Sequence, residues 1–190
     1  MHKLAFALTF LATPVLAEGH VSDGPGPNLE ITVAGESPGT IVIDLLPDVA
    51  PEHVAQIVAL AEEGAYDNVV FHRVIEGFMA QTGDVQFGKA DGDTQRAGIG
   101  GSDLPNLNAE FSEVPFDRGV VGMARAQDPN SANSQFFIMF EEGHFLNGQY
   151  TVFGRVVEGM DVVDGIKRGQ GPNGSVLGAA DVMTNVRVVE

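Results

Sequence analysis

Short apolar segments separated by turns constrain the fold of this chain more than any other feature of its sequence. Eight segments have the length and apolar character of β-strands: residues 29–34, 40–45, 69–75, 78–81, 120–125, 135–140, 151–157 and 182–189. Eight antiparallel strands can close into a barrel whose interior is filled by side chains. We therefore predict a mainly β protein built as a closed eight-stranded antiparallel β-barrel, on whose outer wall a ligand must bind.

Helical patterns are few. Residues 51–63 are predicted to form a helix, because Pro51 suits a first turn and Gly64 suits a C-cap. Apolar residues recur there at helical spacing, so that one face covers a core: Val54, Ile57, Val58 and Ala61. A second, short helix is expected at residues 160–166. Residues 83–118 are long, glycine-rich and irregular, which is typical of a functional loop.

The first residues indicate export. His2 and Lys3 precede an apolar stretch that ends in Val15-Leu16-Ala17, with small residues at the cleavage positions. We expect residues 1–17 to be a signal peptide, 18–28 a flexible leader, and 29–190 one domain in the periplasm. The rival interpretation is a retained N-terminal anchor, which the short apolar stretch disfavours. No membrane insertion of the mature chain is expected, since no second stretch is long enough to cross a bilayer.

Charge and composition exclude several kinds of chemistry. The chain has 26 acidic and 10 basic residues, which opposes nucleic-acid binding because phosphate contacts need clustered Lys and Arg. It has no cysteine, no histidine pair at metal-ligand spacing, and no nucleophile elbow around Ser134. The glycine-rich residues 98–101 lack the lysine and helix of a phosphate-binding loop. We expect neither a metal nor a cofactor.

Two motifs predict an apolar groove with a few fixed hydrogen-bonding groups. Residues 71–84 place Arg73 and Gln81 among apolar residues, and residues 133–138 place Gln135 beside two phenylalanines. Rotation about an X-Pro bond needs only such a groove, because twisting breaks amide resonance and frees a lone pair on the proline nitrogen. A guanidinium that donates to this lone pair stabilises the transition state. The alternative is that Arg73 is an ordinary strand arginine paired with an acid.

These motifs carry a family resemblance. Residues 71–84, residues 133–138, and the run Phe153-Gly154-Arg155-Val156 followed by Gly159-Met160 resemble the signatures of cyclophilin-type peptidyl-prolyl cis-trans isomerases. The resemblance covers residues 29–190. It implies a barrel capped by two helices and catalysis of X-Pro rotation in proline-containing unfolded or flexible polypeptides. The protein is expected to assist the folding of exported proteins and to act as a monomer.

The resemblance also implies roles for individual residues. Arg73 matches the catalytic arginine, and Gln81 and Gln135 match amides that hold the substrate backbone. His72 matches a histidine that is structural rather than a general base. The proline pocket would be walled by Phe78, Met79, Phe137 and Leu146. The strand beside the bound peptide would be Ala124, Arg125 and Ala126, with Arg125 acting through its backbone and Ala126 in a neighbouring small pocket.

Two further substrate-binding positions depart from the family pattern. Phe145 stands where many members carry the tryptophan that contacts cyclosporin, so weak cyclosporin binding is expected. Tyr150 stands where many members carry a pocket histidine, and its ring can still cover a proline. Two other hypotheses remain at this point. One is a non-catalytic module that binds proline-containing segments, and the other is a holdase chaperone that uses the groove and residues 83–118.

Overall fold

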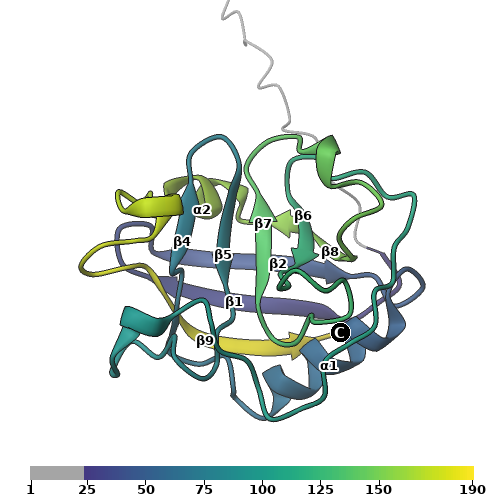
Figure 1. The fold of residues 1–190 in the computed structure, drawn as a ribbon, viewed down its shortest axis with the longest axis horizontal. Coiled ribbons are helices and arrows are strands. Elements are labelled where there is room, and N and C mark those ends of the chain that lie inside the picture. The colour runs from purple at the N-terminus through teal and green to yellow at the C-terminus, as the bar shows by residue number, and fades with distance from the viewer. Residues whose placement is uncertain (1–23) are drawn as a thin grey trace, which may run out of the picture.

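The computed structural model describes residues 24–190. The expected signal peptide and most of the expected leader lie outside this part of the chain. Figure 1 shows the arrangement of the elements. The strands are β1 (Asn28–Ala34), β2 (Gly39–Leu45), β3 (Val69–Val70), β4 (Arg73–Ile75), β5 (Met79–Thr82), β6 (Val120–Met123), β7 (Phe136–Met139), β8 (Val152–Glu158) and β9 (Val182–Val189). The α-helices are α1 (Pro51–Glu62) and α2 (Met160–Gly165), and the 3-10 turns are η1 (Thr94–Arg96), η2 (His144–Leu146) and η3 (Pro172–Gly174).

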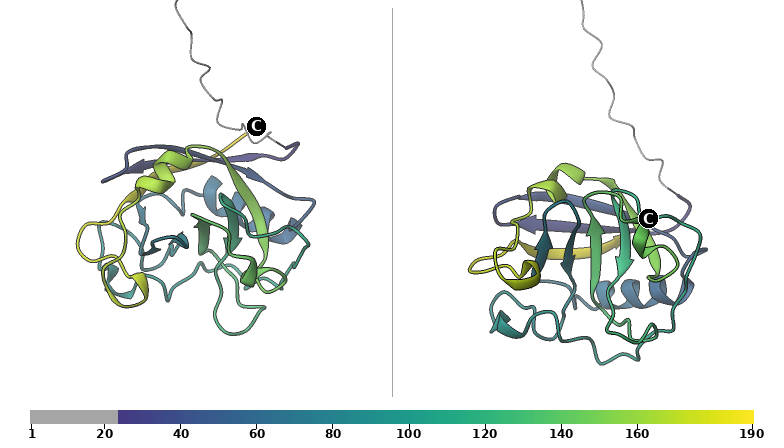
Figure 2. Two further views of the ribbon diagram at one scale, coloured as in Figure 1. Left: turned by 90° about the horizontal axis from the view of Figure 1, so that it is seen from above. Right: turned by 45° about the horizontal axis from the view of Figure 1, so that its top comes forward.

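The strands form one antiparallel sheet that curls around the core but stays open (Figure 2). Its order is β3-β9-β1-β2-β8-β6-β7-β5-β4, so β3 and β4 are its two edges. The prediction of a closed eight-stranded barrel is therefore wrong in both respects, since the described part of the chain has nine strands in an open sheet. The mainly β character and the two helices are confirmed.

The difference arises at Phe71 and His72. Residues 69–75 were predicted as one strand, but the chain leaves the sheet at this dipeptide and re-enters it at the opposite edge. Loop backbone occupies the place where two edge strands would have paired. The Phe71 N–H donates to the Asp181 carbonyl at 2.9 Å, and the His72 carbonyl accepts from the Val176 N–H at 3.0 Å. These hydrogen bonds satisfy backbone N–H and C=O groups that, in a closed barrel, would have paired between neighbouring strands.

The helices form where the sequence predicts them. Helix α1 begins at Pro51, carries Glu52 in its first turn, and is followed by Gly64 in a left-handed conformation (φ 69°). Its apolar stripe is buried against the sheet, with Val54 and Ile57 in the main core, and it lies beside β9 (Figure 1). None of the helices described is long and apolar enough to cross a membrane.

Strand alternation separates the core from the outer wall of the sheet. Phe136 points inward, where its ring packs edge-to-face on Tyr66 and Phe153 at centroid distances of 5.7 and 6.0 Å. Phe137 points to the other face and joins a smaller apolar cluster that includes Met79. This opposite orientation of neighbouring side chains follows from the two-residue period of a strand. The outer wall of β5, β6 and β7 therefore carries an apolar cluster of its own.

One buried carboxylate holds the first part of the irregular segment 83–118. Asp84 is completely buried, and its Oδ1 accepts from the N–H groups of Gln86 and Phe87 at 3.1 and 2.8 Å. Its Oδ2 accepts from the N–H groups of Gly98 and Gly100 at 2.7 and 2.9 Å. Four backbone donors thus converge on one side chain, which fixes the path of residues 98–100 beside the sheet.

Candidate active site

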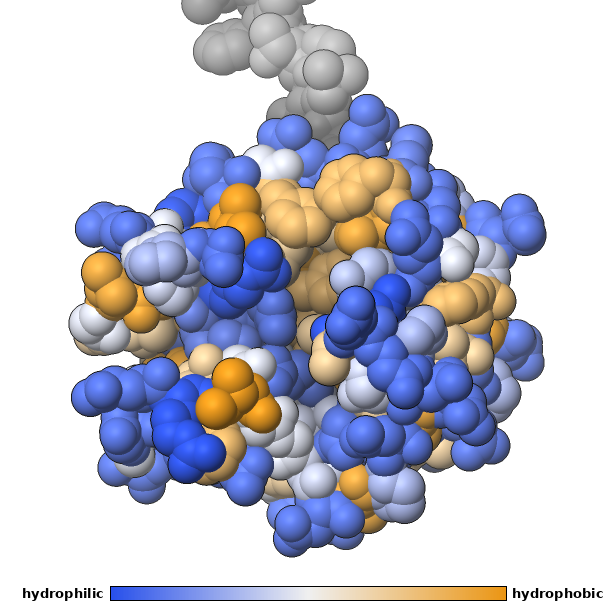
Figure 3. Space-filling model, viewed as in Figure 1, coloured by the Kyte–Doolittle hydropathy of each residue, from blue (hydrophilic) through white to orange (hydrophobic). Residues whose placement is uncertain are grey.

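The outer wall of the sheet carries a cavity of about 240 Å³. Space-filling atoms show this face hollowed near its middle, with apolar residues along one border (Figure 3). All the residues that line the cavity are among those proposed from the sequence: Arg73, Phe78, Met79, Gln81, Ala124, Arg125, Phe137, Phe145, Leu146 and Tyr150. Met79, Phe137 and Leu146 are buried and belong to one apolar cluster, whereas Phe145 is 65% exposed. The cavity thus has a buried apolar floor and an exposed aromatic ring at its rim.

Strand register brings the polar residues to this cavity. Arg73 of β4 lies opposite Gln81 of β5, and Gln81 lies opposite Phe137 of β7. Directly opposed residues on neighbouring strands project from the same face. Arg73, Gln81 and Phe137 therefore form one row across three strands, with the cation at one end and an apolar ring at the other.

A chain of hydrogen bonds fixes the guanidinium of Arg73. Its Nη1 donates to Gln81 Oε1 at 3.1 Å, and its Nε donates to the Asn173 carbonyl at 2.9 Å. Gln81 Nε2 donates to Gln135 Oε1 at 3.0 Å, and Gln135 Nε2 donates to the Gly100 carbonyl at 2.8 Å. Each group in this series donates to the next, from Arg73 through Gln81 and Gln135 to Gly100, which lies in the loop that Asp84 anchors.

Arg73 is not paired with a carboxylate among the described residues, so it is not a strand arginine in an ordinary ion pair. Burial lowers the pKa of its guanidinium, and the pKa of so strong a base still leaves it a hydrogen-bond donor at neutral pH. A half-buried cation that keeps its charge without an anionic partner is suited to interact with a lone pair that appears in its cavity.

Arg125 and Tyr150 form one lip of the cavity. The Tyr150 ring packs edge-to-face on Phe137 at 5.9 Å, and the Arg125 guanidinium carbon lies 4.3 Å from the centre of the Tyr150 ring. Arg125 also donates to the carbonyls of Ala126, at 3.0 Å, and of Gln149, at 2.8 Å. Its side chain therefore orients the tyrosine, in addition to the backbone role expected from the sequence.

A second hollow of about 560 Å³ adjoins the first and shares Gln81, Ala124 and Arg125 with it. The remaining two predicted site residues, Ala126 and Gln135, line this second hollow. Sequence reasoning missed most of its other wall, which comes from residues 98–102, 106, 131, 133 and 134. The sequence identifies residues 98–101 only as glycine-rich, and Gly100 contributes through its backbone carbonyl, which leaves no side-chain signal.

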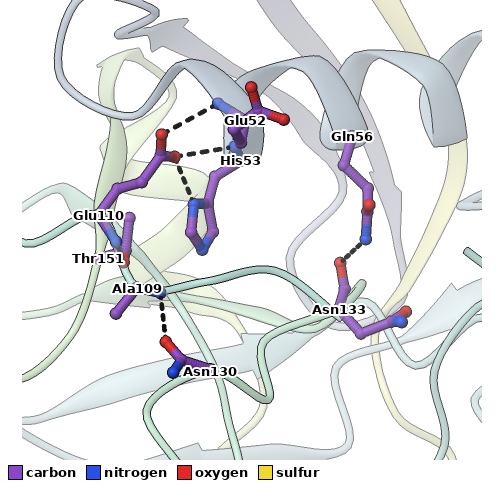
Figure 4. A network of polar contacts seen from close by, with 8 residues as sticks. All are labelled: Glu52, His53, Gln56, Ala109, Glu110, Asn130, Asn133 and Thr151. Carbon is purple, nitrogen blue, oxygen red and sulfur yellow. Dashed lines mark hydrogen bonds and ion pairs between the residues drawn. The ribbon is translucent and has the colours of Figure 1, made fainter. Parts of the chain in front are cut away.

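The wall of the second hollow is tied to helix α1 through Asn133 (Figure 4). Asn133 Oδ1 accepts from the Ser102 N–H at 2.7 Å, and its backbone carbonyl accepts from Gln56 Nε2 of α1 at 2.9 Å. Asn133 Nδ2 donates to the Leu104 carbonyl at 2.9 Å. A single residue of the second motif thus connects the helix, the loop and the groove.

Glu110 caps the start of the same helix (Figure 4). Its Oε1 accepts from the Glu52 N–H at 3.2 Å, and its Oε2 accepts from the His53 N–H at 3.1 Å and from the His53 ring at 2.6 Å. Burial by itself raises the pKa of the Glu110 carboxyl, but these hydrogen bonds outweigh burial and lower the pKa. The ionised carboxylate therefore stabilises the fold.

Glu110→Gln is expected to lower the free energy of unfolding at neutral pH by about 1–3 kcal/mol, because the charged acceptor is lost. Since the folded-state pKa is lowered, the carboxylate's contribution is present above its unfolded pKa of about 4.3 and is lost as the pH falls below it. Urea unfolding at a series of pH values measures this. Glu113→Gln, at an exposed neighbour, is the control. An unchanged pH slope in Glu110→Gln would contradict the assignment.

His72 precedes Arg73 in the chain but does not line the cavity. Burial lowers the pKa of His72 to about 4 against the opposing charge of Asp84, and the charge of Arg73 lowers it further, so the ring is neutral at pH 7. Both ring nitrogens are buried, and hydrogen bonding to the Val70 backbone and to the Gln135 side chain contributes to this pKa. Among residues 24–190, no group of three or more His, Cys, Asp or Glu side chains is placed to hold a metal.

Known proteins share this sequence and fold. The family described as cyclophilin type peptidyl-prolyl cis-trans isomerase matches residues 29–189. A probable peptidyl-prolyl cis-trans isomerase of Brucella suis is 58% identical over 180 residues, covering 93% of this chain and 92% of the relative. Peptidyl-prolyl cis-trans isomerase B of Escherichia coli is 42% identical over 137 residues, covering 68% of this chain and 79% of the relative.

Solved structures agree with these matches. A crystal structure of a cyclophilin from Hirschia baltica superposes with a TM-score of 0.69 at 28% identity, covering 87% of this chain and 75% of that one. A cyclophilin-type isomerase of Cryptosporidium parvum, crystallised in the presence of the dipeptide Ala-Pro, gives 0.72 at 24% identity, covering 86% of this chain and 99% of that one. The fold of the curled sheet is thus shared with both structures.

Proposed function

The chain belongs to the family of cyclophilin-type peptidyl-prolyl cis-trans isomerases, and from that premise we propose how its groove acts and on what. Arg73 is the catalytic residue, and the cavity beside it binds the proline of unfolded or flexible polypeptides. The observation that carries this assignment is the Arg73 guanidinium, fixed by Gln81 and free of any acidic partner among the described residues, at the edge of an apolar cavity.

The cavity favours the twisted peptide bond. A planar X-Pro amide is polar, and rotating it breaks resonance against a barrier of roughly 18–20 kcal/mol. The twisted amide is less polar, so the buried floor of Met79, Phe137 and Leu146 accommodates it at less cost than water does. Arg73 then donates to the lone pair on the proline nitrogen, and each ~1.4 kcal/mol removed from the barrier gives about tenfold in rate.

Hydrogen bonding prepares Arg73 for this role before a substrate arrives. Gln81 Oε1 and the Asn173 carbonyl hold two sides of the guanidinium, so little reorganisation is needed when the lone pair forms. Each of the two glutamine amides has two N–H donors and uses one of them within the chain Gln81–Gln135–Gly100. The second N–H of each amide is available for a carbonyl of the bound peptide.

The proposed clients are exported proteins that fold in the periplasm, where isomerisation of X-Pro bonds is a slow step. The support is the basic and apolar N-terminal sequence that ends at Ala17. The protein acts as a monomer. The export proposal is tested by fractionating cells that express the full chain, and by mass spectrometry of the product to see whether residues 1–17 have been removed. A chain retained in the cytoplasm with residues 1–17 intact would overturn the export proposal.

The isomerase proposal is tested by exchange spectroscopy on an X-Pro tetrapeptide. We expect the protein at catalytic concentrations to raise the rate of cis-trans exchange, and the peptide to shift amide signals of residues that line the cavity. A peptide that binds at those residues without faster exchange would instead indicate a non-catalytic binding module. Suppressed aggregation of a proline-free client, with no faster exchange, would indicate a holdase.

Cyclosporin is expected to bind weakly, because Phe145, unlike a tryptophan, has no indole N–H to donate. Its ring is exposed at the rim of the cavity, and its centroid lies 5.5 Å from that of Phe78. Phe145→Trp adds this donor and should tighten binding about tenfold or more, as measured by titration calorimetry. Phe111→Trp is the matched control, since Phe111 is also exposed and lines neither hollow. Equal affinities for wild type and Phe145→Trp would contradict this explanation.

A further inference from the structure

An exposed turn beside the catalytic arginine contains a reactive dipeptide. Asn173 and Gly174 belong to η3, which lies against β4 at the edge of the sheet (Figure 1), and Ser175 forms an isolated β-bridge with Arg73. Asparagine followed by glycine is prone to spontaneous loss of ammonia, because glycine has no side chain to hinder attack of its backbone nitrogen on the asparagine side chain. A chemically labile pair therefore lies next to the groove.

The fold itself requires this pair. Gly174 has a φ of 77°, and an added Cβ would clash with Ile75 Cγ1, so no larger residue fits there. Asn173 is also left-handed, with a φ of 55°, which asparagine tolerates better than most residues. The glycine that packing requires at position 174 is thus also the residue that leaves Asn173 open to attack.

The side chain of Asn173 is not held in place. The residue is exposed to water, and its side chain forms no hydrogen bond with the described part of the chain. The Gly174 N–H donates to the Gly171 carbonyl at 3.2 Å, which is a long and therefore weak bond. The second Asn-Gly pair of the sequence differs, because Asn147 Oδ1 accepts from the Phe116 N–H at 2.9 Å. Of the two pairs, the one at Asn173 is therefore expected to react.

We propose that Asn173 is a site of spontaneous deamidation and that the reaction inactivates the isomerase. The Gly174 nitrogen gives up its proton and attacks Asn173 Cγ, which closes a succinimide ring, while the side-chain NH2 leaves with a proton as ammonia. Water then adds to either ring carbonyl and breaks its bond to nitrogen, which gives a carboxylate and releases a proton. Opening at the former backbone carbonyl yields isoaspartate, and opening at Cγ yields aspartate. Water is the only co-reactant.

Both products change the surroundings of Arg73. Its Nε donates to the Asn173 carbonyl at 2.9 Å, and this acceptor is neutral. In isoaspartate the main chain runs through Cγ, so the former backbone carbonyl becomes a free carboxylate on the same α-carbon. In aspartate the carboxylate lies on the side chain of the same residue. Arg73, which has no acidic partner among the described residues, thereby gains one.

A carboxylate at position 173 opposes catalysis. It binds a guanidinium more strongly than a neutral carbonyl does, because both partners of the hydrogen bond are then charged. The carboxylate therefore competes for Arg73 with the lone pair that appears in the twisted amide. This consequence rests on the proposed function of Arg73, whereas the deamidation itself does not.

The first test is chemical. The whole protein is kept in warm, mildly alkaline buffer, which favours loss of the Gly174 N–H proton, beside a synthetic peptide of residues 169–178. Mass spectrometry with fragmentation measures asparagine, aspartate and isoaspartate at position 173. Asn173 should react at most about tenfold more slowly in the protein than in the peptide, the factor that one hydrogen bond of a turn is worth. An intact Asn173 beside a consumed peptide, or reaction confined to Asn147, would overturn the proposal.

The second test is functional. Anion exchange separates the deamidated protein, which carries an additional negative charge, from the unmodified protein. The kcat/KM of the deamidated fraction for an X-Pro peptide should be about 10- to 100-fold lower, the factor that a hydrogen bond to a charged group is worth. The Nε–H signal of Arg73 should also shift, which reports the new partner without reference to activity. Equal kcat/KM in both fractions, or an unshifted Nε–H signal, would contradict the proposed inactivation.

Variants assign the effect to one residue. Asn173→Gly keeps a backbone carbonyl and the left-handed conformation but cannot deamidate, so its own initial activity should persist while that of wild type decays. Asn173→Asp should start with a lowered kcat/KM. Asn185→Asp adds the same charge at an exposed position of β9 that lines neither hollow of the groove, and its initial rate should equal that of wild type. Decay of Asn173→Gly as fast as wild type would overturn the proposal.

The readouts keep this proposal separate from the proposed function. Mass spectrometry and the Nε–H signal of Arg73 need no isomerase activity, so deamidation at Asn173 and its contact with Arg73 can be established in a protein that fails the isomerase assay. An active isomerase whose Asn173 stays intact would give the opposite result.

Discussion

Arg73→Ala is expected to lower kcat/KM for an X-Pro peptide by about 100- to 1,000-fold, the loss typical of removing one preorganised donor to a transition state. The guanidinium is fixed by Gln81 and Asn173, so alanine leaves the cavity intact but without its donor. Binding of a ground-state peptide should change much less, since the lone pair exists only in the twisted amide. Exchange spectroscopy at several peptide concentrations separates kcat from KM.

Two other substitutions make this result interpretable. Arg187→Ala removes an arginine that is exposed and paired with Glu30 on the sheet, away from the groove, and should leave the rate unchanged. Arg73→Lys keeps the charge but loses the planar fork, so an intermediate rate is expected. The same rate in Arg73→Ala as in wild type would remove Arg73 from the mechanism. An equal loss in Arg187→Ala would make the effect one of overall charge.

Asp84→Asn is expected to lower the free energy of unfolding by about 2–4 kcal/mol, because a charged acceptor of four backbone N–H groups is replaced by a neutral amide whose NH2 group turns donors toward two of them. The carboxylate is completely buried, so bulk water does not replace the lost hydrogen bonds. Activity should also fall, because Gly98 and Gly100 would no longer be held and the Gly100 carbonyl positions Gln135. Urea unfolding and the exchange assay measure the two effects.

Asp103→Asn is the matched control for this variant. Asp103 is an exposed aspartate of the same irregular segment, so the identical change in charge should alter stability by less than about 0.5 kcal/mol. If Asp84→Asn and Asp103→Asn lose the same stability, the effect is due to net charge. If Asp84→Asn is destabilised but fully active when folded, the hydrogen-bond chain from Asp84 to Gln135 does not position the site.

Local patterns in the sequence account for the elements but not for how the sheet ends. The stripe of α1, the turn at Gly64 and the opposite orientations of Phe136 and Phe137 follow from short-range periods, and the structure shows each of them. The break at Phe71 and His72 does not, because it depends on backbone bonds to Asp181 and Val176, which lie more than one hundred residues away along the chain. No local pattern encodes such pairing.

The same distinction holds for the groove. Arg73, Gln81 and Phe137 belong to strands whose alternation and family resemblance both place them on one face. The role of the Gly100 carbonyl was missed, since a backbone acceptor leaves no mark on residue type. The role of Asp84 was missed because its four backbone donors belong to an irregular loop that no periodic pattern predicts. The contact of Arg125 with Tyr150 was missed because it depends on a side-chain conformation at the end of a loop.

The two ends of the sheet also affect how this protein coexists with its clients. An unfolded polypeptide readily adds a strand to any long unpaired edge, which leads to aggregation. Here the terminal strands β3 and β4 have only two and three residues, and loop backbone already bonds to the residues that flank them. These edges therefore offer almost no free backbone groups to which a foreign chain could add a strand. An isomerase that binds extended polypeptides is thereby protected from co-aggregating with them.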